Sequence, residues 1–223
     1  MTIHAKPTEG DEVASEKRRS STAGDETRAR ILEATLVTLK EEGIVGASAR
    51  AIARRGDFNQ ALIFYHFGSV GDAIVGAVDL MSARRMADHR PRLEAVTTLR
   101  DLVDVARAMH HEDTANDNMT VLTQAFAGAA GDPVIGPKLY ATLAQWSDMV
   151  TQSINRVLGD SPLASIASAE QLGQGISALF LGIELLADLD PSSADVDALF
   201  DLLMVTASMV EVIAAGGLTP PIE

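Results

Sequence analysis

The chain has 223 residues and a mass of 23.6 kDa, which suits one domain of ordinary size together with a small one. Its lack of cysteine excludes disulfides, thiol nucleophiles and cysteine-bound zinc or iron–sulfur sites. Apolar residues make up 47% of the chain and aromatic residues only 4%. The core must therefore consist of aliphatic side chains and methionine, a composition that favours helices over strands.

Two further features bear on where the protein works. The sequence contains no uninterrupted run of about 18 apolar residues, so it predicts no membrane span. The first 24 residues are polar and charged, and they lack the apolar stretch of a signal peptide. From the sequence we therefore expect a cytoplasmic protein without a membrane partner.

The net charge of −13 is distributed unevenly along the chain. Residues 1–107 contain 16 Lys or Arg and 16 Asp or Glu, whereas residues 108–223 contain 2 and 15. Residues 17–55 alone carry nine basic and five acidic side chains. A polyanion would therefore bind only the N-terminal part, although a solvated basic helix face is an equally good interpretation of charge alone.

Helical periodicity begins at Asp25, and no segment alternates as a strand does. In the first predicted helix, Ala29, Leu32, Leu36 and Leu39 form an apolar stripe, and Gly43 ends it. We predict an all-α fold of about nine helices, with disordered tails at 1–24 and 216–223. The predicted helices are 26–42, 49–55, 60–66, 69–88, 93–111, 116–130, 137–158, 169–189 and 194–215.

Residues 25–68 are typical of a helix-turn-helix domain, because a long helix is followed by two short helices with Gly56-Asp57 at the turn. Ser48 and Asn59 are predicted to cap the two short helices. The segment from Ser69 to Asp72 resembles a capping box that opens the next helix. Residues 69–215 are predicted to form a second, helical domain.

Four of the nine aromatic residues fall between positions 58 and 67. We assign Phe58, Phe64 and Phe67 to a small core. Tyr65 and His66 carry polar tips, so we expect them to reach phosphate oxygens from the end of a helix that lies in the major groove.

Residues 27–80 resemble the DNA-binding domain of the tetracycline-repressor (TetR) family of transcriptional regulators. The resemblance is carried by three stretches: residues 27–34 (Thr-Arg-Ala-Arg-Ile-Leu-Glu-Ala), 48–53 (Ser-Ala-Arg-Ala-Ile-Ala) and 62–67 (Leu-Ile-Phe-Tyr-His-Phe). It covers about a quarter of the chain strongly. The later helices agree with the family's ligand-binding and dimerisation domain only in number and length.

The resemblance implies a ligand-responsive regulator, which we expect to be a repressor. It would bind palindromic double-stranded DNA as a homodimer and be released by a small-molecule effector. Gln60 and Ala61 would face base edges. The residues that would contact phosphates are Thr27 with the start of its helix, Ser48, Arg50, Asn59, Tyr65 and His66. For Arg54 and Arg55 the sequence leaves two alternatives, a phosphate contact or exposure to solvent. For the cluster Lys17, Arg18 and Arg19 the alternatives are an arm that binds the minor groove and a free tail.

Besides a different reading surface at residues 59–62 and Gly71 at the next helix start, two departures from the family pattern bear on this hypothesis. Gly56-Asp57 replaces the usual Ala-Gly turn, and Val70 stands where the family has a lysine that commonly contacts phosphate. The second departure keeps an alternative open, namely a helical ligand-binding or interaction protein without DNA function.

A single copy would contact few phosphates and bind weakly at physiological salt, so the DNA-binding hypothesis requires a dimer. Two copies of the last two helices could form a four-helix bundle, although burial within one subunit is the alternative. The predicted interface residues are Leu172, Ile176, Leu179, Ile183, Leu199, Leu203 and Val210. A ligand pocket is predicted among the middle helices, lined by Met109, Met119, Leu122, Phe126, Tyr140, Leu143, Trp146 and Met149.

The remaining motifs do not predict chemistry. His110 and His111 are adjacent in a helix and cannot face one point, so we predict no metal site and no cofactor. We find no Ser/His/Asp arrangement, glycine-rich phosphate loop or two-histidine metal helix, and hence predict no catalytic residues.

Overall fold

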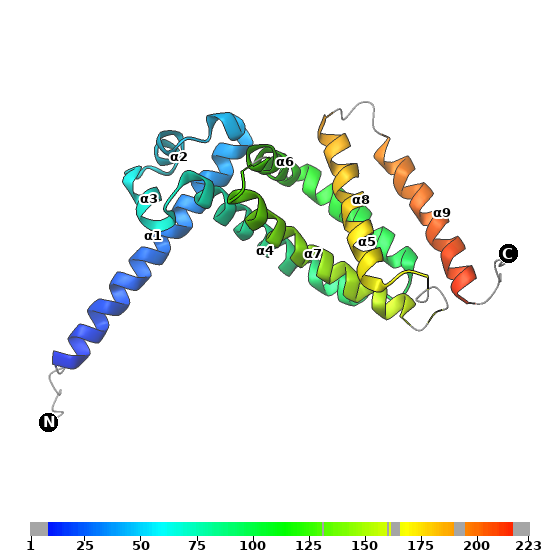
Figure 1. Ribbon diagram of the computed structural model, residues 1–223. Coiled ribbons are helices and arrows are strands. Elements are labelled where there is room, and N and C mark those ends of the chain that lie inside the picture. Colours follow the sequence, from blue (N-terminus) through cyan, green and yellow to red (C-terminus); the bar gives the residue numbers. More distant parts are fainter. Residues whose placement is uncertain (1–8, 131, 160, 162–165, 190–194, 216–223) are drawn as a thin grey trace, which may run out of the picture. The chain divides into compact units, whose positions relative to one another are not determined.

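The computed structural model describes residues 9–130, 132–159, 161, 166–189 and 195–215; the side chains of 9–22 and of Asp188 lie outside the description. Within these residues the chain forms nine α-helices and no strand, as predicted (Figure 1). The backbone divides into two compact units, residues 1–77 and 78–223. No single described helix is long and apolar enough to span a membrane. Helices α3 (Ala61–Phe67) and α4 (Val70–Glu94), taken as a pair bent by 68°, meet that criterion by length and composition only.

The first unit contains α1, α2, α3 and the first residues of α4. Its core is formed by Ile31, Ala34, Ile52, Ile63 and Ala73, which brings together one or two residues from each of the four helices. The bounds are α1 (Glu9–Gly46), α2 (Ala49–Gly56), α3 (Ala61–Phe67) and α4 (Val70–Glu94), the last of which continues into the second unit.

Helix α1 is longer than the predicted 26–42, since residues 9–24, assigned to a tail, are helical. The prediction relied on an apolar stripe, and a helical extension that is polar on all sides has none. Gly43, with φ 67°, interrupts the helix where the sequence predicted its end. The predicted tails at 1–8 and 216–223 lie outside the described residues.

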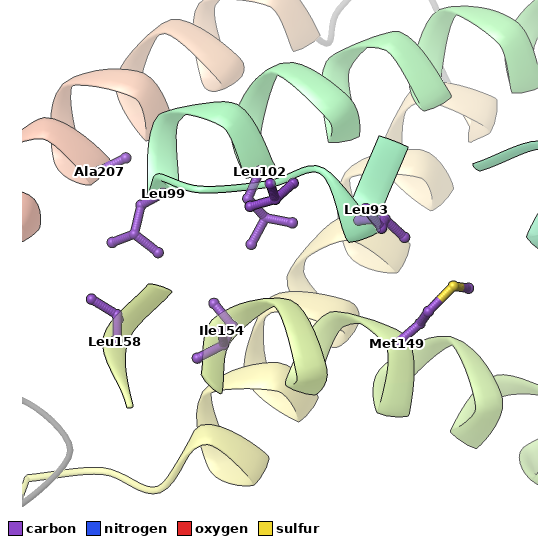
Figure 2. Packing of buried hydrophobic residues seen from close by; sticks show 8 residues of the cluster. Leu93, Leu99, Leu102, Met149, Ile154, Leu158 and Ala207 are labelled. Atoms are coloured by element: carbon purple, nitrogen blue, oxygen red, sulfur yellow. The ribbon is translucent and has the colours of Figure 1, made fainter. Parts of the chain in front are cut away.

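The second unit contains the rest of α4 and five further helices. A central cluster joins α4, α5, α7 and α9 through Leu93, Leu102, Ile154 and Ala207, among others (Figure 2). Phe200 of α9 is fully buried, and its ring lies 5.8 Å from the His110 ring of α5. The helices are α5 (Leu99–Ala115), α6 (Asn118–Ala129), α7 (Ile135–Leu158), α8 (Ala169–Leu189) and α9 (Val196–Ala214).

The two boundaries in this unit that differ most from the prediction are the end of α4 and the start of α5. Helix α4 continues through Pro91 to Glu94, although the sequence predicted its end at residue 88. Helix α5 begins at Leu99 rather than at residue 93, because Thr98 and Asp101 form a capping box there. Hydrogen bonds from the Thr97 backbone and side chain lower the pKa of Asp101 to about 2, so this cap is ionised at neutral pH.

Candidate nucleic-acid interface and ligand cavity

The orientation of α3 is set by one buried residue. Ile63 is fully buried among α1, α2 and α4, and Phe67, one turn further along, also packs on this core. The Arg28 side chain of α1 donates to the His66 carbonyl oxygen at 3.3 Å, and its guanidinium carbon lies 4.4 Å from the centre of the Phe67 ring. Helix α3 is therefore fixed along one of its faces, by contacts with α1, α2 and α4.

The opposite face of α3 is exposed. Gln60, Ala61, Phe64 and Tyr65 lie on it, Phe64 with 51% and Tyr65 with 82% of their surface accessible. The assignment of Phe64 to the core is wrong. The spacing could have shown this, because Phe64 lies one turn after Gln60, whereas the buried Ile63 lies one turn before Phe67.

Side chains at the helix starts hold the turn between α2 and α3. Ser48 caps α2 by accepting from the Ala51 N–H at 3.2 Å, and Asn59 Oδ1 accepts from the Ala61 N–H at 2.9 Å. Asp57 is left-handed, with φ 51°. A Cβ at Gly56 would lie 2.2 Å from the Phe58 ring and 2.9 Å from the Ala34 side chain, so the close packing of this turn requires glycine.

The basic residues of this unit fall into two groups. Arg50 and the half-buried His66 remain on the surface of α2 and α3. Arg54 and Arg55, whose role the sequence left open, form ion pairs with Glu42, and Arg55 also pairs with Glu41. These two arginines therefore connect α2 to the end of α1.

The structure corrects the expectation for Thr27 and also places residues 17–19, Ser69 and Val70. Thr27 lies inside α1 and donates to the Ala23 carbonyl at 2.9 Å, so no free helix-start amides are available beside it. Lys17, Arg18 and Arg19 lie within α1, and their side chains are outside the described residues. Val70, the position where a lysine was expected, packs against the core of the first unit, and Ser69 Oγ accepts from the Asp72 N–H at 3.0 Å, as the predicted cap requires.

The second unit contains a partly open cavity of about 590 Å³, which is lined by residues of α4 to α9. Seven of the eight residues predicted to bind a ligand line it: Met109, Met119, Leu122, Phe126, Tyr140, Leu143 and Trp146. Met149 does not; it is buried in the central cluster instead. A methionine on α7 could pack equally well in the cavity wall or in the central cluster. The rotation of α7 about its axis decides which of the two Met149 faces.

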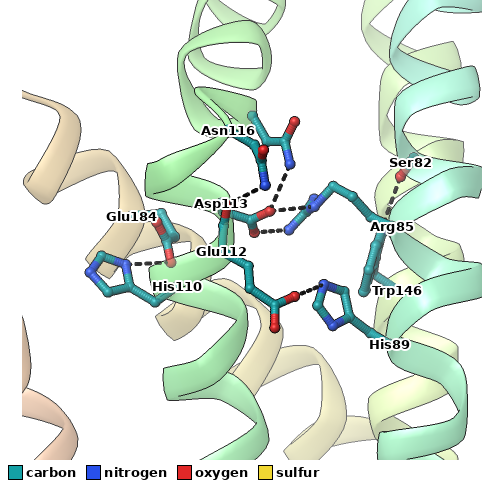
Figure 3. Close-up of polar contacts among 10 residues, drawn as sticks. Ser82, Arg85, His89, His110, Glu112, Asp113, Asn116, Trp146 and Glu184 are labelled. Carbon is teal, nitrogen blue, oxygen red and sulfur yellow. Dashed lines mark hydrogen bonds and ion pairs between the residues drawn. The ribbon is translucent and has the colours of Figure 1, made fainter.

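One wall of the cavity contains a buried ion pair. Arg85 of α4 donates through Nε to Asp113 Oδ1 of α5 at 2.7 Å and through Nη2 to the second oxygen (Figure 3). The guanidinium carbon lies 4.8 Å from the centre of the Trp146 ring, and Trp146 Nε1 donates to Ser82 Oγ at 2.6 Å. The Asp113 side chain is 1% exposed.

Two histidine–glutamate contacts lie near this pair. His110 Nδ1 is 2.9 Å from Oε1 of the buried Glu184, and burial raises the pKa of that carboxyl group. His89 Nε2 is 3.7 Å from Glu112, and burial lowers the pKa of the His89 imidazole. His111 instead lies on the surface, 3.6 Å from Asp197. No group of three or more metal-binding side chains converges among the described residues.

The residues predicted for a dimer interface mostly face the interior of the second unit. Ile183 is 5% exposed, so its assignment to an interface is wrong. Ile176, Leu179, Ile183, Leu203 and Val210 line the cavity, and Leu172 packs on the central cluster. Of the seven, only Leu179 and Leu199 are exposed.

The exposed apolar residues of α8 and α9 form a different set, at helical spacing on the outer face of each helix. On α8 they are Leu185, Leu186 and Leu189, and on α9 Leu202, Val205, Met209 and Val212. A periodic pattern alone cannot separate the two faces when both are apolar. We call these seven residues the α8–α9 outer face.

Comparison with known proteins agrees with this geometry. Residues 31–69 match the family model for bacterial regulatory proteins of the tetR family. An uncharacterized HTH-type transcriptional regulator of Mycobacterium tuberculosis is 24% identical over 135 residues, which cover 60% of this chain and 69% of that protein. An HTH-type transcriptional repressor of the same species is 40% identical over 65 residues, 29% of this chain and 34% of that one.

Solved structures show the same fold. A TetR-family transcriptional regulator from Cytophaga hutchinsonii superposes with a TM-score of 0.68 at 16% identity, covering 84% of this chain and 96% of that one. The multidrug binding protein EbrR in complex with imidazole superposes with a TM-score of 0.59 at 21% identity, covering 80% and 88%. Residues 31–69 thus match the tetR family of bacterial regulatory proteins, and the described chain shares its all-α fold with solved TetR-family regulators.

Proposed function

We propose that this regulator is a repressor that binds palindromic operator DNA as a homodimer and leaves it when a small molecule occupies the cavity of its second unit. The observation that supports DNA reading most directly is the exposed face of α3. Its members, Gln60, Ala61, Phe64 and Tyr65, are presented on a helix whose other face is fixed by Ile63.

The chemistry of this face suits a major groove. The Gln60 amide can make two hydrogen bonds to an adenine, and Ala61 and Phe64 can contact thymine methyl groups. Tyr65, at the exposed end of the helix, can donate its hydroxyl to a phosphate, and Arg50 of α2 can pair with another. We therefore expect a half-site that contains A·T pairs.

Dimerisation is supported by the α8–α9 outer face. Seven large apolar side chains at helical spacing on two helices exceed the scattered apolar residues that a monomer normally exposes. A second copy that binds through the same face would create a two-fold axis and a palindromic site. The repressor role is supported by the 40% identity over 65 residues to an HTH-type transcriptional repressor.

The experiment is a selection of genomic fragments by the full-length protein, followed by gel shifts at two salt concentrations. We expect recovered sites with inverted half-sites about one helical turn apart and a shift that weakens as salt rises. Gln60→Ala should weaken binding to the selected site about five- to a hundredfold. Absence of selected fragments would refute DNA binding, and a shift that is indifferent to salt would refute the proposed phosphate contacts.

A further inference from the structure

The walls of the cavity are almost entirely apolar. Each of the helices α4 to α9 contributes aliphatic or aromatic side chains, and several of them, including Leu102, Met109, Leu139 and Phe200, are less than 9% exposed. The volume of about 590 Å³ falls within the range of pockets that hold drug-sized ligands. A ligand here would exchange water for hydrocarbon over most of its surface.

Among the described residues that line the cavity, Arg85 is the only one that carries a formal charge. Both oxygens of Asp113 already accept hydrogen bonds from it, and one of them also accepts from Asn118 Nδ2 at 3.0 Å. The Trp146 ring covers the guanidinium group. The wall therefore contains a neutralised ion pair and offers no unpaired charge to a ligand.

This arrangement disfavours ionised ligands of either sign. A carboxylate would lose its hydration and would have to compete with Asp113, which binds Arg85 through two hydrogen bonds. An ammonium group would meet the guanidinium of Arg85 and no carboxylate in the lining. Burying either charge without a partner costs far more than burying a hydroxyl or an ester.

Polar side chains in the wall are few, and several of them already make hydrogen bonds within the protein. Trp146 Nε1 donates to Ser82, and Thr142 Oγ1 donates to Asp79. Ser177 Oγ on α8, in contrast, is buried without a hydrogen-bond partner. A rotation about its χ1 bond would let this hydroxyl bond to one uncharged polar group of a ligand.

We infer that the effector is an uncharged, predominantly apolar molecule with at most one or two hydrogen-bonding groups. The inference rests on the proposed function, because that proposal places an effector in this cavity. The inference specifies the chemical class of ligand that this cavity binds. It also assigns to Arg85 and Asp113 the exclusion of charged analogues of that ligand.

The single tryptophan of the chain makes the test direct. Trp146 lines the cavity, so its fluorescence reports occupancy without any DNA. Full-length protein is titrated with 1-decanol, decanoate and decylammonium, each below its aggregation concentration. We expect decanol to bind at least tenfold more tightly than either ion. Equal or tighter binding of an ion, or binding of none of the three, overturns the inference.

Asp113→Asn tests the role of the ion pair, since it keeps the shape of the side chain and removes its charge. Arg85 then lacks a counter-charge, and decanoate should bind at least tenfold more tightly than to the wild type, with decanol little changed. Asp201→Asn removes an exposed charge that pairs with Arg107 and should change neither. A folded Asp113→Asn protein without a gain in decanoate affinity contradicts the assigned role.

A second variant covers the case in which Asp113→Asn does not fold. The double change Arg85→Met with Asp113→Leu replaces the pair by apolar groups, a substitution that proteins often tolerate. It should bind decanol within about threefold of the wild type and still reject both ions, and loss of decanol binding counts against the inference. DNA binding of the ligand-free protein is measured separately, so failure of the proposed function is recognised independently of the cavity chemistry.

Discussion

Arg85 and Asp113 form a buried, two-point ion pair that joins α4 to α5 within the second unit. Asp113→Ala should lower the free energy of unfolding by about 3–5 kcal/mol, because it leaves the guanidinium of Arg85 buried without its partner. Asp201→Ala, which breaks the more exposed pair with Arg107, should cost about 0–1 kcal/mol. Urea denaturation of both variants measures the difference, and equal losses would show that burial of the pair is unimportant.

Arg50 is expected to contact a phosphate in each half-site. Arg50→Ala should therefore reduce the slope of log affinity against log salt by about 0.9 for each of the two copies, with little change in sequence preference. Arg90→Ala removes the same charge from the second unit, where Arg90 pairs with Glu94, and should leave the slope unchanged. Fluorescence anisotropy over a salt series measures both slopes; identical slopes would place Arg50 away from the DNA.

The α8–α9 outer face is expected to hold two copies together. A glutamate at Val205 or Met209 would bury a charge in the interface, so the dimer should dissociate at micromolar concentration. Val134→Glu introduces the same charge at an exposed apolar position of the second unit and should leave the dimer intact. Sedimentation velocity distinguishes these outcomes. A wild-type protein that sediments as a monomer would remove the basis of the proposed palindrome.

The lowered pKa of His89 makes stability depend on pH. Because the folded protein binds the proton less tightly than the unfolded chain, stability is complete above the usual pKa of 6.5 and is lost as pH falls from there toward the lowered value. His89→Gln, which does not titrate, should lose less stability over that interval. Thermal midpoints of the two proteins between pH 7.5 and 5 should converge as pH falls; a constant difference would contradict the assignment.

The turn between α2 and α3 requires a residue without a side chain at position 56. Gly56→Ala should cost about 1–3 kcal/mol, because its Cβ would displace the Phe58 ring or the Ala34 side chain. Gly24→Ala, in the middle of α1 with no atom within 4 Å of the added Cβ, should stabilise the protein by up to about 1 kcal/mol. Chemical denaturation measures both; a neutral Gly56→Ala would mean that Phe58 moves freely.

The cavity residues show which features of the site a local sequence pattern can predict and which it cannot. Seven predicted residues line the cavity because apolar side chains of the middle helices must face inward wherever those helices pack. Met149 lies on the same helix as Trp146 but belongs to the central cluster. The polar partner of Arg85 could not be predicted, since Asp113 is 28 residues away and only the packing of α5 on α4 brings the two together.

The sequence by itself determined the helical fold, the start of α2 at Ser48, the cap of α4 at Ser69 and the helix-turn-helix, because caps, glycines and apolar spacing act over a few residues. Only the tertiary structure decided which face of each apolar helix is buried. It turned Ile183 toward the cavity and left Leu202 and Met209 outside, and it exposed Phe64 beside Gln60. Such choices depend on contacts between helices far apart in the chain, and when both faces of a helix are apolar, no local pattern records them.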